Sequence, residues 1–204
     1  ENGHAVDTGV RVGGEDVVYS LERASNKDSV ATHKTYTLHN HMKSIEMVTD
    51  LNELNTVKDS DTGKSVMEIL KSGVGNDITE LTTDDEAANN ASGVYQVIKV
   101  TTTEPFPQVL NYLAHQSAGV LNKDQVEAYN SKFTVEAYDP TKDICYGDFA
   151  AVKSGDNMLW CSGPYQFVSV DDYGITFEKN PGYMADEKAF APRISNMYMK
   201  FIKD

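Results

Sequence analysis

Three histidines, His33, His39 and His41, are the first side chains in this sequence that could bind a metal, because they fall within nine residues. A zinc site needs ligands that converge on one point, as paired cysteines or two histidines one helical turn apart do. His39 and His41 are two residues apart and would point to different sides of a helix. The spacing favours helix packing or the lining of a pocket, and we expect neither a metal site nor any other cofactor.

The polar segment from Asp59 to Ser65 shares features with two kinds of ligand-binding loop but departs from both. A phosphate-binding loop ending in Gly-Lys-Ser needs a glycine where this chain has Lys58, and it needs a preceding buried strand. A calcium loop needs a glycine at its sixth position and a closing glutamate at its twelfth, and both are missing. We expect Ser65 to begin a helix instead.

Nucleophilic and acid–base chemistry have little support in the sequence. The two cysteines, Cys145 and Cys161, could form a disulfide that closes a short loop and contributes about 3 kcal/mol. Two partly buried free thiols are the alternative, and the sequence leaves both open. No nucleophile elbow, reactive-cysteine signature or carboxylate pair of defined separation is present. We therefore expect a protein that is not an enzyme.

The composition is that of a globular protein with a strong negative charge. The 204 residues carry a formal net charge of -13, with 40% hydrophobic and 24% charged residues. Such a charge disfavours binding to nucleic acid, and no apolar run is long enough to span a membrane. The first four residues lack the features of a signal peptide, as expected of a cytosolic, a processed or an excised chain.

Helices are predicted where capping residues or breakers precede an amphipathic segment. Acidic residues precede Val17, Asn122 is a suitable N-cap, and the prolines at 105 and 107 suit the start of a helix. Gly73 is expected to end the helix that begins at Ser65. We predict helices at residues 17–23, 28–42, 65–71, 109–115, 123–129 and 148–152.

Strands are predicted where β-branched and aromatic residues alternate with polar ones. The clearest pair flanks a turn at residues 171–174 and forms a hairpin, and polar residues 50–64 and 84–90 are expected to be loops. We predict the other strands at residues 45–48, 77–81, 94–101, 119–121 and 193–202, with Ile194, Tyr198 and Phe201 as apolar positions of the last. The fold class is α+β, with a mixed, largely antiparallel sheet and helices packed on one face.

Four segments, taken in order, resemble one family. The segments are Gly14 to Ala24, Val94 to Pro107, the hairpin from Ser162-Gly163-Pro164-Tyr165 to Asn180-Pro181-Gly182-Tyr183, and Arg193 to Ile202. Together they resemble the extracytoplasmic solute-binding proteins of peptide-type ABC importers, family 5, which bind oligopeptides, dipeptides or nickel. The resemblance implies part of lobe I of a type II periplasmic-binding-protein fold.

In that family two lobes close on a ligand. The resemblance implies that residues 1–160 form an inserted α+β subdomain of lobe I, that residues 161–204 form a hairpin and strand returning to its main part, and that the second lobe is absent. The chain would then be a fragment of a protein that captures oligopeptides outside the cell and delivers them to an ABC permease. Alternatives are another solute (a nickel chelate, haem, glutathione or an oligosaccharide) or a surface interaction module without a ligand.

The same resemblance implies a location and a binding site. The amino-acid sequence of residues 29–36 is similar to that of Gram-positive members of the family, which are lipid-anchored at the extracellular face of the membrane. A periplasmic protein is the alternative. The ligand-binding residues would be His33, near a helix start, and His115, Gln116 and Ser117 in a turn. Peptides are held in such a cleft mainly by backbone hydrogen bonds, so half a cleft is expected to bind weakly or not at all.

Overall fold

The computed structural model describes residues 9–25, 40–130, 160, 162–180, 183 and 193–202. The chain divides into two compact units, one formed by Arg11–Ala128 and the other by Glu1–Val10 with Tyr129–Asp204. The predicted helix at 148–152 and both cysteines lie outside the described residues. The division at residue 160 that the family resemblance implies stays a prediction.

The first helix, α1, spans Gly14–Ser25 and confirms the helix predicted around Val17. Glu15 and Asp16 lie in its first turn and Arg23 in its last, which is the charge order that the helix dipole favours. Its buried residues include Ser20 and Leu21. The helix is therefore amphipathic, although part of its buried face is polar.

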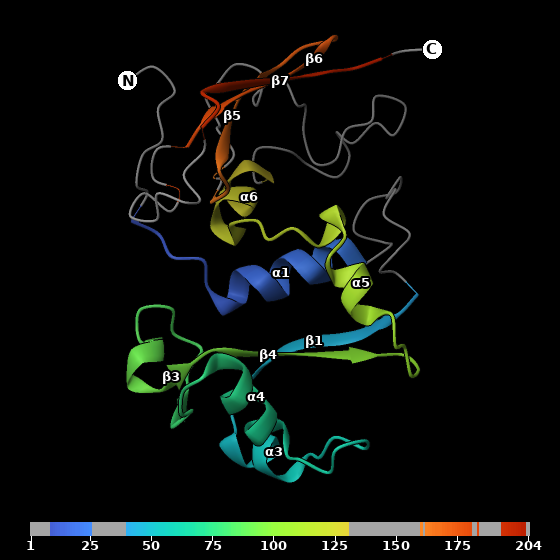
Figure 1. The fold of residues 1–204 in the computed structure, drawn as a ribbon, viewed down its shortest axis with the longest axis vertical. Coiled ribbons are helices and arrows are strands. Elements are labelled where there is room, and N and C mark those ends of the chain that lie inside the picture. Colours follow the sequence, from blue (N-terminus) through green and yellow to red (C-terminus); the bar gives the residue numbers. More distant parts are fainter. Residues whose placement is uncertain are drawn as a thin grey trace. The chain divides into compact units, whose positions relative to one another are not determined.

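Helix α1 packs on a two-stranded antiparallel ribbon of β1 (Met42–Val48) and β4 (Val97–Thr102). Figure 1 shows α1 lying along this ribbon. The approach is close at Gly14, because a Cβ there would collide with the Met47 sulfur. The strand predicted at residues 45–48 is confirmed. Of the helix predicted at 28–42, residues 28–39 lie outside the described ones. Met42 begins a strand rather than ending a helix.

The segment predicted as a loop at residues 50–64 contains a helix, α3, at Leu51–Thr56. The Asp50 side chain accepts a hydrogen bond from Asn52 N at 2.8 Å and caps this helix. Leu54 is only 4% exposed, because it packs in the apolar cluster of this unit. The prediction of a loop was wrong for residues 51–56, because Leu54 is buried in that cluster and Leu51 packs against it.

Helix α4 spans Val66–Val74 and begins as predicted at Ser65. Ser65 and Glu68 form a capping box in which each side chain bonds the other's backbone N–H. The helix does not end at Gly73, as predicted, but at Gly75, which adopts a left-handed conformation with φ of 68°. A C-cap needs that positive φ, and Gly75 supplies it.

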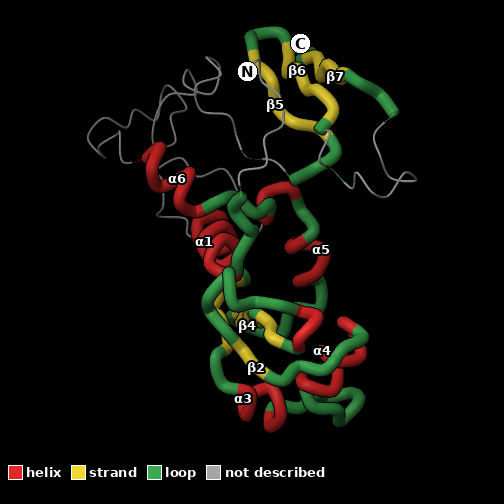
Figure 2. Tube along the Cα trace, turned by 90° about the vertical axis from the view of Figure 1, so that its left-hand side faces the viewer, coloured by secondary structure: helices red, strands yellow, loops and turns green. Residues whose placement is uncertain are grey.

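The strand predicted at residues 94–101 is divided at Gln96 into β3 (Val94–Tyr95) and β4. β3 pairs in parallel with the two-residue strand β2 (Glu80–Leu81). These elements and both helices share one apolar cluster, formed by Val48, Leu54, Met67, Ile78 and Tyr95. Figure 2 shows α3 and α4 on the side of β4 away from α1, so helices lie on both sides of the ribbon.

Short helices complete this unit. They are the 3-10 turn η1 (Asn90–Ser92), α5 (Val109–Leu113), the 3-10 turn η2 (Gln116–Ala118) and α6 (Lys123–Asn130). As predicted, Asn122 begins α6, since its Oδ1 accepts from Gln125 N at 2.8 Å. The predicted buried strand at 119–121 is not formed, and Val120 is exposed. The backbone N–H and C=O groups of Leu121 bond the Ser20 side chain instead.

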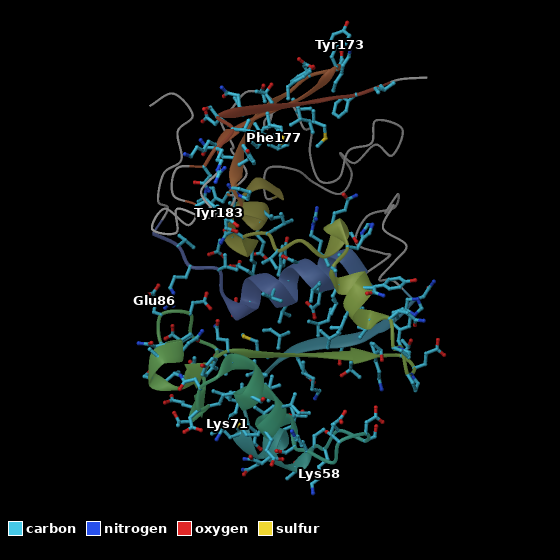
Figure 3. The ribbon with its side chains drawn as sticks, viewed as in Figure 1. Lys58, Lys71, Glu86, Tyr173, Phe177 and Tyr183 are labelled. Atoms are coloured by element: carbon cyan, nitrogen blue, oxygen red, sulfur yellow. The ribbon has the colours of Figure 1, made fainter. Side chains whose placement is uncertain are left out.

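The other unit contains a three-stranded antiparallel sheet in the order β5-β6-β7. The strands are β5 (Tyr165–Val170), β6 (Gly174–Lys179) and β7 (Asn196–Lys200). The predicted hairpin is confirmed, with Asp171 Oδ1 accepting from the N–H groups of Tyr173 and Gly174 in its turn. Figure 3 labels Tyr173 at this turn and Phe177 within β6.

The predicted α+β class is confirmed, and the sheet is largely antiparallel. Among the described residues, the strands form three small sheets rather than one: β1–β4, β2–β3 and β5–β6–β7. Within the described residues, no helix is long and apolar enough to cross a membrane.

Candidate functional site

An open groove of about 260 Å³ lies beside α1 in the unit Arg11–Ala128. Its lining residues are Glu15, Val18, Tyr19, Glu22, Met47 and Lys123. The first four come from one face of α1, because their spacings of three and four residues bring side chains together on a helix. Strand β1 and the start of α6 provide the other two. The groove thus depends on three elements that are distant in sequence.

A buried carboxylate sets the position of α6 against α1. Asp16 is 6% exposed; its Oδ2 accepts from Gly13 N at 3.1 Å and its Oδ1 from Lys123 N at 2.7 Å. One side chain therefore satisfies backbone donors at the starts of both helices. Such charge-assisted bonds are stronger than those of a neutral acceptor, so Asp16 fixes where Lys123 enters the groove.

Ser20 attaches the same helix to the segment before α6. Its hydroxyl accepts from Leu121 N at 2.8 Å and donates to Leu121 O at 3.3 Å. Ser20 is buried, so these two bonds also satisfy polar groups that have no access to water. With Asp16 they hold the groove's two helical walls in a defined geometry.

A third set of hydrogen bonds holds the start of α1 against the loop before η1. Gly14 N donates to Gln96 Oε1 at 3.0 Å, and Gln96 Nε2 donates to Asp85 Oδ1 at 2.6 Å. Arg11 Nη1 donates to the carbonyl groups of Asp85 and Ala88. Gln96 thus takes part in a side-chain network at the point where β3, which pairs with β2, gives way to β4, which pairs with β1.

The charges of the groove are unequal at its two ends. Lys123 Nζ lies 2.9 Å from Glu15 Oε2, and the hydrogen bond and negative charge of Glu15 raise the pKa of Lys123. The Glu22 carboxylate makes no hydrogen bond or ion pair with any other described residue. An apolar floor beside the Glu22 carboxylate can attract a cation.

Three of the four predicted ligand-binding residues are neighbours in η2. His115 is its N-cap, and His115 Nδ1 accepts from Ser117 N at 3.2 Å and lies 2.8 Å from Ser117 Oγ. Gln116 is exposed, and η2 contacts both α1 and α5. His33 lies outside the described residues. Whether these side chains face a ligand cleft stays a prediction.

His41 takes part in an aromatic cluster rather than in a metal site within the described ranges. Its ring stacks on Phe106 with centroids 4.0 Å apart, and Tyr112 meets both rings edge-on. The Nδ1 atom of His41 is buried and has no hydrogen-bond partner in the described part of the chain. Among the described residues, no three His, Cys, Asp or Glu side chains are grouped as metal ligands would be. Both other histidines of the sequence cluster, His33 and His39, lie outside those residues.

Sequence reasoning missed most of the groove. The spacing of Glu15, Tyr19 and Glu22 was a signal that one face of α1 is polar, but Met47 and Lys123 have no local pattern that joins them to it. The burial of Asp16 and Ser20 was also missed. Both are common surface residues, and their partners lie about one hundred positions further along the chain.

No family model matches the sequence, and no curated protein matches it either. Among solved structures, the chain is similar to HbpA2 from Haemophilus parasuis, with a TM-score of 0.49 and 15% sequence identity. The match covers 98% of this chain and 29% of that one, so this chain spans less than a third of the length of HbpA2. A likeness at this TM-score carries no assignment of family or ligand.

Proposed function

We propose that this chain is a section of an extracytoplasmic solute-binding protein that captures oligopeptides and delivers them to an ABC permease. In this proposal the chain belongs to the first of two lobes, residues 1–160 form an inserted subdomain, and residues 161–204 return to the main part of that lobe. The whole protein works outside the cytoplasm, either lipid-anchored at the extracellular face of the membrane or in a periplasm. It binds its ligand without chemical change.

The observation that supports this proposal is the agreement between the resembling segments and the elements they form. The first segment forms α1, the second forms β4 followed by a proline-containing break and α5, and the last two form β5, β6 and β7. All four segments lie in the order that the family resemblance implies.

The ligand-contacting residues of the proposal are His33, His115, Gln116 and Ser117. In η2 the side chains of His115 and Ser117 bond each other and Gln116 is exposed, so Gln116 is the side chain that we propose for direct contact with an extended peptide. Each such hydrogen bond contributes only about 1 kcal/mol net while water competes for the same groups. Closure of a second lobe over the peptide would exclude that water, so affinity belongs to the two-lobed protein.

Mass spectrometry of ligands that co-purify with the two-lobed parent protein tests this proposal. Mixed short peptides are the expected result. Recovery of a single nickel chelate, haem, glutathione or oligosaccharide would show that the protein binds another solute, and the proposed role in transport would remain. Recovery of no ligand from the native protein would favour a surface interaction module and contradict capture of a solute.

Two substitutions in the parent protein test the site. Gln116→Ala and His115→Ala should each weaken peptide binding several-fold in titration calorimetry, because a cleft contact is lost. Asn55→Ala, at an exposed position of α3 in the same unit, is the matched control and should leave binding unchanged. Equal peptide affinities for all three variants would show that His115 and Gln116 do not contact the ligand.

The 204-residue chain by itself provides the complementary measurement. We expect titration with di- to pentapeptides to give no binding tighter than about millimolar, since uncovered hydrogen bonds contribute little. Micromolar affinity would show that the isolated chain has a complete site. Incubation with a peptide panel should leave every peptide intact, and cleavage would contradict the passive role.

A further inference from the structure

The connection between β1 and β4 is much longer than an antiparallel pair of strands needs. The two strands stay paired up to Val48 opposite Val97, so the chain leaves the ribbon and returns to it at the same point. Antiparallel neighbours are usually joined by a tight turn or a short loop. Here residues 49–96 contain α3, α4, β2, η1 and β3. A folded segment therefore stands in the place of a turn.

The two faces of the ribbon bury different sets of side chains. Register partners of an antiparallel pair share a face, and successive residues alternate between faces. Met47 and Ile98 are partners and both lie beside Gly14, so their face meets α1. Val48 and Val97 are the next pair and lie on the opposite face, where Figure 2 shows α3 and α4. The ribbon thus separates α1 from the helices of the connection.

The apolar cluster of this unit comes almost entirely from the connection. Four of its five buried members lie within residues 49–96, namely Leu54, Met67, Ile78 and Tyr95. The fifth, Val48, directly precedes the connection, and Val97, which packs against the cluster, directly follows it. Leu21 and Ile45 are also buried, but they lie outside this cluster as the described residues form it. The connection therefore has a core of its own.

The connection and the ribbon are expected to depend on each other unequally. A segment of this length buries only a small core and is marginally stable alone. Pairing of β1 with β4 holds its two ends together, which removes the entropy cost of closing the loop. The ribbon packs on α1, and α1 has bonds outside the connection, from Asp16 and Ser20 to the segment that begins α6. The connection thus needs the ribbon, whereas the ribbon does not need the connection.

One set of contacts, which we call the latch, joins the connection to the start of α1. Gly14 N donates to Gln96 Oε1 at 3.0 Å, and Gln96 Nε2 donates to Asp85 Oδ1 at 2.6 Å. The Asp85 carboxylate lies so close to Gly13 that an added Cβ would collide with it. Gly13 N instead donates to Asp16 of α1 itself. Two adjacent amides are therefore held by different parts of the chain.

From these observations we propose that residues 49–96 form a module that opens and closes as one cooperative unit while α1 and the β1–β4 ribbon stay folded. Cooperative units of this kind often coincide with supersecondary structure. The closed module seats the start of α1 through the latch, and α1 provides one wall of the groove. Opening of the module would therefore free that end of the wall. The proposal is independent of the function proposed above.

Residue-resolved amide exchange of the 204-residue chain tests the module. Leu54→Ala removes part of the module's core and should accelerate exchange at Ile69 and Thr82 by about tenfold or more. The amide of Gly14 should accelerate with them, because its acceptor belongs to the module. The protected amides of β1 and β4, and that of Leu21 in α1, should change by less than about twofold.

Gly13→Ala tests the latch without altering the module's core. The added Cβ would displace the Asp85 carboxylate and disturb its bond to Gln96. We expect several-fold lower protection of the Gly14 amide and unchanged protection at Thr82. Gly73→Ala is the matched control, because no atom lies within 4 Å of a Cβ added there, and it should leave Gly14 unchanged.

Replacement of residues 49–96 by a short Asn-Gly turn gives a second measurement on the same amides. The shortened chain should keep the protection of Leu21 and of Gly13, whose acceptor is Asp16. It should lose the protection of Gly14, whose acceptor has been removed. The two neighbouring amides of one helix start would then separate the contribution of the module from that of α1.

Two results would each overturn the module. In one, Leu54→Ala accelerates exchange in α1 and the ribbon as much as in α4, which would make the unit Arg11–Ala128 a single cooperative structure. In the other, the shortened chain has no protected amides in α1, so the ribbon needs the connection. Unchanged protection of Gly14 in all of these variants would exclude the latch.

Discussion

The unit Arg11–Ala128 and the sheet β5–β6–β7 bury their side chains in different ways. The former has an apolar cluster that includes Leu54 and Met67, and it has buried polar groups whose hydrogen bonds are satisfied. The sheet has one buried aromatic residue, Phe167, and a strand, β7, that is exposed along its whole length. Regular hydrogen bonding alone therefore does not imply a packed element.

This difference indicates where the stability of each region originates. In the helical unit, side chains from four or more elements share one core, so the loss of one side chain affects them all. In the sheet, β7 contributes backbone hydrogen bonds but little buried apolar surface. Substitutions should consequently be felt strongly in the first region and weakly at β7, which the following measurements test.

The largest contrast is expected between two truncations to alanine. Leu54→Ala should lower the free energy of unfolding of the helical unit by about 2–5 kcal/mol, because it leaves a cavity in the core. Met199→Ala, at a half-exposed position of β7, should change the free energy of unfolding of the unit that contains the sheet by about 0.5 kcal/mol or less. Urea denaturation followed by circular dichroism measures the loss of unfolding free energy in both variants. Equal losses would contradict the difference in packing between the two regions.

The buried polar network should give the next largest effect. Asp16→Asn keeps the size of the side chain but replaces one acceptor oxygen with a donor that faces a backbone N–H. We expect a loss of about 1–3 kcal/mol from the unsatisfied group. The control is Glu15→Gln, one residue earlier and exposed, which should have little effect. If the two variants were equally stable in urea, the bridging role of Asp16 would be wrong.

Removing the cap of α4 should have a smaller effect. Ser65→Ala loses the hydrogen bond to Glu68 N and should lower the free energy of unfolding by about 1 kcal/mol. Ser72→Ala, at an exposed position within the same helix, should instead raise it by a few tenths of a kcal/mol, since alanine favours helix. Thermal unfolding should show that Ser65→Ala lowers the melting temperature and Ser72→Ala raises it. If both variants shift it in the same direction, the cap is not the cause of the Ser65→Ala effect.

The same cap makes stability depend on pH. Hydrogen bonds from the Ser65 backbone and side chain lower the pKa of Glu68 from 4.5. A carboxyl group whose pKa is lower in the folded state stabilises the protein above its unfolded pKa, and this contribution is lost as the pH falls through the folded pKa. The difference in urea midpoint between the wild type and Glu68→Gln should therefore shrink from pH 7 toward about pH 3. A difference that does not change with pH would contradict the capping role of Glu68.

The smallest effect is expected at Lys99, which lies on the face of the ribbon toward α3. Its Nζ is 2.8 Å from Glu46 Oε1 and 2.7 Å from Glu53 Oε1, and these hydrogen bonds raise its pKa. All three side chains are at least one-third exposed, so salt screens the interaction. Lys99→Met should lower the urea midpoint slightly in dilute buffer and not at about 1 M salt. A loss that persists at high salt would indicate packing rather than charge.

Local signals in the sequence predicted many elements of both units. Ser65 with Glu68 specified the start of α4, Asn122 specified the start of α6, and the turn after Asp171 specified the hairpin. These signals succeed because the interacting groups lie within about four residues of each other, so their geometry is the same in any fold. The predicted end of α4 failed by two residues, since two nearby glycines were equivalent in sequence.

The sequence by itself determined the α+β class, the order of elements and the presence of a strand around Tyr198. Only the tertiary structure decided that Asp16 and Ser20 are buried, that Leu54 forms a helix within a polar segment, and that Gln96 divides a strand. The physical reason is that these outcomes depend on partners distant in the chain, whose desolvation and hydrogen bonding no local pattern encodes. For the candidate site, the sequence supplied the residues of η2, while the groove exists only because α1, β1 and α6 meet.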